Sequence, residues 1–71
     1  MSASAFAERA ASADAALMAY MLRTSCDCED CLADLLCDLM HWADHTRFNF
    51  AEEFRHACMR YCAEVALRRA A

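Results

Sequence analysis

Apolar side chains recur every three or four positions along most of this chain, a spacing that is typical of amphipathic helices. The first such stretch runs from about Ser4 to Arg23, and Thr24 and Ser25 then interrupt it with polar side chains. We therefore expect a first helix over 4–23, with one apolar stripe formed by Phe6, Ala10, Ala13, Leu17, Tyr20 and Met21.

The same periodicity predicts two further helices. One runs from about Asp27 to Asp44, with apolar side chains that alternate four and three residues apart, at Cys28, Leu32, Leu35, Leu39 and Trp42. Another begins after Asn49, which together with Glu52 forms a capping-box pattern, and continues to about Arg69. Its expected buried stripe comprises Phe50, Phe54, Ala57, Cys58, Tyr61 and Val65.

The absence of Gly and Pro supports an all-α fold, because hairpin turns with positive φ normally recruit glycine. The 71 residues suffice for one helical domain spanning 1–71. We predict a small three-helix bundle with short loops and roughly antiparallel neighbours, either monomeric or dimeric. A domain this small has a limited core, and such domains are commonly reinforced by a metal, disulfides or a partner subunit.

Charge is distributed unevenly, although the net charge is only −4. Residues 26–46 contain six acidic side chains and no Lys or Arg, whereas residues 47–71 contain five Arg and three Glu. An acidic chain is poorly suited to neutralising phosphates, so we expect no direct nucleic-acid binding. The longest apolar run, from Ala15 to Leu22, is too short to cross a bilayer, and no leader pattern is evident. These features favour a cytoplasmic protein with reduced cysteines and no membrane contact.

An acidic row is the first candidate site. Asp27, Asp30, Asp34 and Asp38 are three or four residues apart, so a helix over 27–44 would place them on one face, followed by His41 and His45. The spacing of such carboxylates is of the order of that between successive phosphates of a nucleic acid. The ordinary alternative is a solvated helix face, although such faces usually mix both signs of charge. The predicted partner-binding residues are Asp27, Glu29, Asp30, Asp34, Asp38 and Asp44.

A cysteine cluster is the second candidate site. Cys26, Cys28 and Cys31 include one Cys-x-x-Cys spacing, which is used by zinc and iron–sulfur sites. A tetrahedral zinc site would need a fourth ligand from elsewhere, which could be Cys58, Cys62 or a histidine. The plainer interpretation is that Cys28, Cys37, Cys58 and Cys62 are small apolar core residues without any cofactor.

One part of the chain resembles a group of small helical proteins encoded on bacterial phages and plasmids. The resemblance rests on the segment from Asp34 to Asp44, on Phe48 to Phe54 and on Tyr61, and it covers about half of the chain. It implies a mobile-element context rather than a mechanism, and the cysteine cluster is not part of the shared pattern. By analogy with anti-CRISPR proteins, such a protein would act by occluding host machinery.

No catalytic motif is present, so we expect a non-enzymatic protein. The leading hypothesis is an inhibitor whose acidic helix face occludes a basic, nucleic-acid-binding host protein. The alternative is a small zinc-binding protein that uses the cysteine cluster. A third option is a homodimer whose interface includes Leu36, Met40 and Met59.

Overall fold

The computed structural model describes residues 3–70, with side chains from residue 5 onward. These residues form three helices: α1 (Ala3–Thr24), α2 (Cys31–Thr46) and α3 (Phe50–Ala70). Within 3–70 there is no strand. The all-α, three-helix fold predicted from the periodicity is therefore confirmed, and the predicted bounds of α1 and α3 agree to within about a residue at each end.

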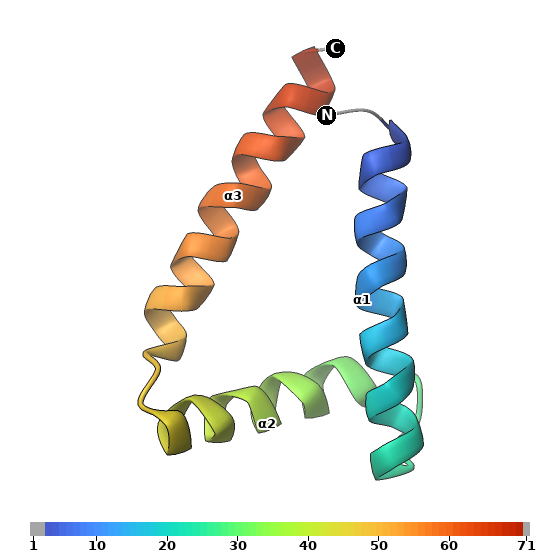
Figure 1. Cartoon of the computed structure of the whole chain (residues 1–71), viewed down its shortest axis with the longest axis vertical. Coiled ribbons are helices and arrows are strands. Elements are labelled where there is room, and N and C mark those ends of the chain that lie inside the picture. The colour runs from blue at the N-terminus through green and yellow to red at the C-terminus, as the bar shows by residue number, and fades with distance from the viewer. Residues whose placement is uncertain (1–2, 71) are drawn as a thin grey trace.

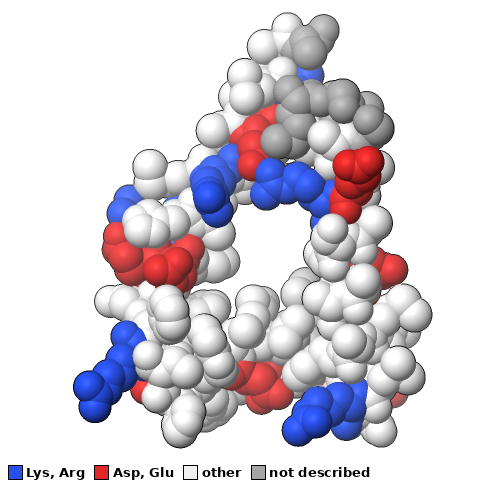
Figure 2. Space-filling model, in the orientation of Figure 1, with Lys and Arg blue, Asp and Glu red and all other residues white. Residues whose placement is uncertain are grey.

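The helices form the three sides of a triangle. α1 and α3 converge at the end where the chain begins and finishes, and α2 runs across their other ends (Figure 1). The expected antiparallel arrangement of consecutive helices is not seen, because α2 lies crosswise to α1 rather than alongside it (Figure 1). The space-filling view shows an opening between the helices (Figure 2).

The corner between α1 and α2 is a sharp turn without glycine. Ser25 adopts a φ of 56°, and its backbone N–H donates to the carbonyl of Met21 at 2.7 Å. The backbone N–H groups of Asp30 and Cys31 both donate to the carbonyl of Asp27, at 3.1 and 2.9 Å. This turn delays the start of α2 to Cys31, four residues later than predicted. Cys31 is buried at this corner.

The corner between α2 and α3 is packed more closely. Arg47 follows the last residue of α2, and its backbone adopts the left-handed conformation. The N–H of Phe48 donates to the carbonyl of Ala43 at 2.9 Å. The rings of Phe48 and Trp42 stack with centroids 5.2 Å apart. The predicted cap of α3 is confirmed, since the Asn49 side chain accepts from the N–H of Glu52 at 3.0 Å.

The third corner joins segments that are far apart in the sequence. Arg9 of α1 forms an ion pair with Glu64 of α3. The guanidinium of Arg68 lies 4.9 Å from the centre of the Phe6 ring, a cation–π contact. Side chains from both helices surround a shallow hollow at this corner.

The expected central core is absent from the described part of the chain. Among side chains from residue 5 to 70, only Cys31 and Ala43 are buried, and each lies at a corner. The apolar stripes predicted for the three helices remain largely in contact with solvent, for example Phe54 at 56% and Tyr61 at 65% exposure. No helix within 3–70 has the length and apolar character needed to cross a membrane.

Candidate partner-binding site

The six predicted partner-binding acids fall into two groups, which we together call the acidic flank. Asp34, Asp38 and Asp44 lie on α2, whereas Asp27, Glu29 and Asp30 lie in the segment before it. The prediction of one continuous helical row is therefore wrong for Asp27 and Asp30. The cause is a separate backbone turn over residues 27–31, so α2 begins only at Cys31 and does not include Asp27 or Asp30.

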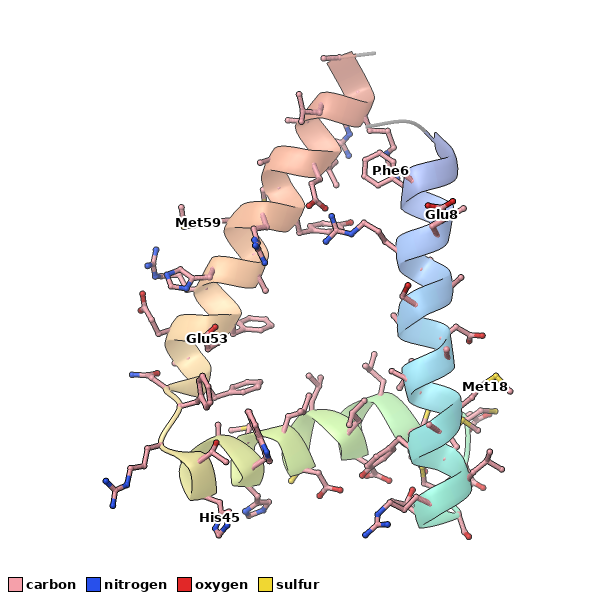
Figure 3. The ribbon with its side chains drawn as sticks, viewed as in Figure 1. Phe6, Glu8, Met18, His45, Glu53 and Met59 are labelled. Carbon is pink, nitrogen blue, oxygen red and sulfur yellow. The ribbon has the colours of Figure 1, made fainter. Side chains whose placement is uncertain are left out.

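On α2 itself, the predicted face exists over a shorter length. Asp34, Asp38, His41 and His45 are separated by four, three and four residues, so they share one side of the helix. His45 points away from the opening between the helices (Figure 3). Leu32, Leu36 and Leu39 follow the opposite side of the same helix. The short acidic row therefore faces outward and the leucines face inward. Asp44 lies to one side of the row.

All six acids of the flank are exposed, and none forms an ion pair with a residue in the described part of the chain. The ion pairs that are present involve Glu64 and Glu52 of α3 instead. Arg23 precedes the flank and Arg47 follows it, and basic groups stand at both lower corners of the molecule (Figure 2). The flank is thus a stretch of carboxylates that form no ion pair with a described residue, bounded by single arginines.

Asp38 differs from the other five acids because it has a structural partner. Its carboxylate accepts a hydrogen bond of 2.5 Å from the hydroxyl of Tyr20 on α1. This bond raises the pKa of Tyr20 above its ordinary value, since the neutral phenol is the donor, and desolvation and the charges of Asp38 and Asp34 add to the effect. Asp38 therefore ties α1 to α2 and is the member of the flank least free to meet a partner.

The sequence interpretation missed the Tyr20–Asp38 pair. Tyr20 was assigned only to the apolar stripe of the first helix. The two residues are 18 positions apart, so no local spacing could have paired them. The useful signal would have been the phenol itself, because a tyrosine in an apolar stripe usually needs a polar partner for its hydroxyl.

The candidate metal ligands do not assemble in the described part of the chain. Cys31 is buried, Cys26 is half-buried and Cys28 is exposed, while Cys62 lies on the far half of α3. The core assignment of Cys28, Cys37, Cys58 and Cys62 is wrong, because all four are exposed on helices that meet only at their ends or in the turn before α2. Burial, and then the neighbouring Cys26 and Cys28, raise the pKa of the Cys31 thiol, which disfavours the thiolate that a metal requires. Within residues 3–70 no three His, Cys, Asp or Glu side chains are placed to hold a metal ion. Zinc binding stays a prediction of the sequence.

The described residues form a small all-α fold, and its acidic flank carries six exposed carboxylates. Comparisons with protein-family models, with curated proteins and with solved structures find no match to this chain. The function must accordingly be argued from the chain's own residues.

Proposed function

We propose that this protein is a non-enzymatic binding protein whose acidic flank occludes a basic, nucleic-acid-binding surface of a host protein. The observation that carries the proposal is that all six carboxylates of the flank are exposed and that none forms an ion pair with a described residue. Isolated carboxylates on a helical protein are usually partnered or interspersed with Lys and Arg. A local excess of six negative charges is suited to a groove lined with arginine and lysine.

The binding mode follows from the position of the flank. Asp34 lies on the outward side of α2, so a partner can approach it without disturbing contacts between the helices. Asp27 and Glu29 extend the negative surface around the α1–α2 corner. Long-range attraction would speed association, by on the order of 10- to 1,000-fold for well-matched charge patterns, and would weaken as salt is added.

The kind of partner follows from the chemistry of the flank and from the resemblance to mobile-element proteins. A surface that competes with phosphates would block DNA or RNA binding by its target. An anti-CRISPR-like inhibitor of an RNA-guided effector is the form of this function that the resemblance favours. The proposal needs no cofactor and no direct contact with nucleic acid.

The test is a competition assay with purified bacterial nucleic-acid-binding proteins, including RNA-guided effectors. Fluorescence anisotropy of labelled DNA reports whether this protein displaces the DNA. The test variant reverses Asp27, Asp34 and Asp44 to Lys, which spares Asp38, the partner of Tyr20, and Asp30, the residue that directly precedes α2. We expect inhibition to weaken at least about tenfold, mainly through a slower association rate.

The matched control reverses Glu8, Asp14 and Glu53 to Lys. These acids are exposed, lie outside the flank and form no ion pair with a described residue, so the net charge changes equally in both variants. The control should retain most of the inhibition. Equal loss in both variants would reduce the effect to overall charge, and no loss in the flank variant would refute the proposed mechanism.

A further inference from the structure

The apolar inner sides of α2 and α3 are not covered by the described part of the chain itself. Tyr61 lines the hollow between α1 and α3, and Leu39 lines the hollow between α2 and α3. Leu32 and Leu36 share the face of Leu39, and Phe54 shares the face of Tyr61. Each of these side chains is at least 38% exposed. We call this set, Leu32, Leu36, Leu39, Phe54 and Tyr61, the inner surface.

The total surface area measures how much remains uncovered. The chain exposes 5977 Å², whereas a compact monomer of its mass of 8.0 kDa would expose about 4,450 Å². The excess is roughly 1,500 Å² per chain. The radius of gyration of 14.4 Å likewise exceeds the value of about 11 Å expected for a compact domain of 71 residues.

Contacts at each corner oppose closure of the opening within one chain. The Tyr20–Asp38 hydrogen bond holds α1 against α2, and the Trp42–Phe48 stack holds the turn from α2 into α3. The Arg9–Glu64 ion pair holds the third corner. Laying the helices side by side would require the two sharp turns at Ser25 and Arg47 to rearrange. Apolar groups around a water-filled opening are unfavourable, so a second molecule is the simpler cover.

We propose that this cover is a second copy of the same chain, packed inner surface to inner surface about a two-fold axis. Burying the excess area of both copies would remove roughly 3,000 Å², which lies within the range of obligate homodimers. A two-fold interface needs a self-complementary surface, and an apolar face of mixed leucine and aromatic side chains meets that need. The acidic flank stays outside the interface, so the dimer is independent of the proposed function.

This interface differs from the patch suggested by the sequence. Met59 points away from the opening (Figure 3), and its sulfur accepts a hydrogen bond from Arg55 on the outer side of α3. Leu36 belongs to the inner side of α2. The two residues therefore cannot belong to one continuous interface around the opening, and the inner surface takes the place of that patch.

The first measurement is the mass of the full chain in solution under reducing conditions, by sedimentation from micromolar to near-millimolar concentration. We expect a particle of twice 8.0 kDa. The mass is required because a compact dimer has a radius of gyration of about 14.5 Å, which would not differ from that of one open chain. The reductant prevents disulfides between the exposed cysteines from producing a false dimer.

The second measurement locates the interface with a photo-crosslinking amino acid, benzoylphenylalanine. One variant carries it in place of Tyr61, on the inner surface, and the control carries it in place of Met59, on the outer side of the same helix. We expect dimeric cross-links from position 61 and at least tenfold fewer from position 59. Both positions are exposed, so neither substitution should prevent folding.

Four results would overturn the proposal. The first is a monomeric mass at every concentration under reducing conditions. The second is a dimer that forms only when the cysteines are oxidised. The third is a stable dimer that cross-links through position 59 but not through position 61. The fourth is the same dimer in a Leu36→Lys variant, because a lysine there would place an unpaired charge from each copy in the apolar interface.

Discussion

The α2–α3 corner and the α1–α3 corner of the triangle are held together by different kinds of contact. At the α2–α3 corner the contacts join residues that are close in sequence. Ala43 is only 2% exposed, the rings of Trp42 and Phe48 stack, and Asn49 caps α3. At the α1–α3 corner, Arg9 and Glu64 meet across 55 positions, and the Arg9 side chain is 54% exposed. The difference shows that this chain builds firm local turns but weak long-range contacts.

Physical chemistry accounts for that difference. Contacts across a short loop form with little loss of chain entropy, whereas a contact across a long segment must overcome the entropy of closing it. An exposed ion pair stabilises a protein by only about 0–1 kcal/mol. The α1–α3 corner therefore contributes little stability by itself, and one chain alone closes no central core around it.

The largest expected effect comes from overfilling the α2–α3 corner. Ala43→Leu adds three carbons at a site with 2% exposure, and overpacking of this kind costs about 1–3 kcal/mol of the free energy of unfolding. Ala33→Leu, at an exposed position of the same helix, is the control and should change stability little. Urea denaturation followed by circular dichroism measures both. Equal stability of the two variants would show that the corner is less tightly packed than we describe.

A smaller effect is expected at the α1–α3 corner. Glu64→Gln removes the ion pair with Arg9 and should lower the free energy of unfolding by less than about 1 kcal/mol, with a loss that fades as salt increases. Glu8→Gln, an exposed acid without a described ion pair, is the control. A loss as large as that from Ala43→Leu would reverse the ranking of the two corners.

The α1–α2 corner offers a spectroscopic test of the Tyr20–Asp38 hydrogen bond. The hydrogen bond to Asp38 raises the pKa of Tyr20, so its stabilising contribution is complete below the ordinary pKa of 10.0 and is lost as the pH rises through the higher, folded-state value. In a Tyr61→Phe background, Tyr20 is the single tyrosine. Its absorbance titration should shift downward on Asp38→Asn. An unchanged titration would show that the bond is absent in solution.

Much of the local structure could be predicted from the residues. Apolar spacing located three helices, and the Asn49–Glu52 pattern located the cap of α3. The start of α2 was predicted four residues early because the acidic residues around Asp30 continue the helical spacing. Periodicity cannot reveal that the backbone from Asp27 to Cys31 forms a separate turn, since the same side chains fit either backbone.

The candidate site was predicted in composition rather than in arrangement. The acidic residues were identified from charge alone, and their exposure agrees with the preference of carboxylates for water. Their division between a loop and a helix depends on where α2 begins. The commitment of Asp38 to Tyr20 depends on how α1 meets α2, which is a contact between distant parts of the chain.

The sequence by itself determined which segments are helical, which side of each helix is apolar and where negative charge accumulates, because these properties depend on neighbours within a few residues. The tertiary structure alone decided that the helices meet at corners rather than along their lengths. That outcome depends on the backbone conformations of Ser25 and Arg47 and on side-chain contacts between residues that are distant in the sequence. It is also the reason that the inner surface remains uncovered, since helices that meet only at their ends cannot bury one another's apolar sides.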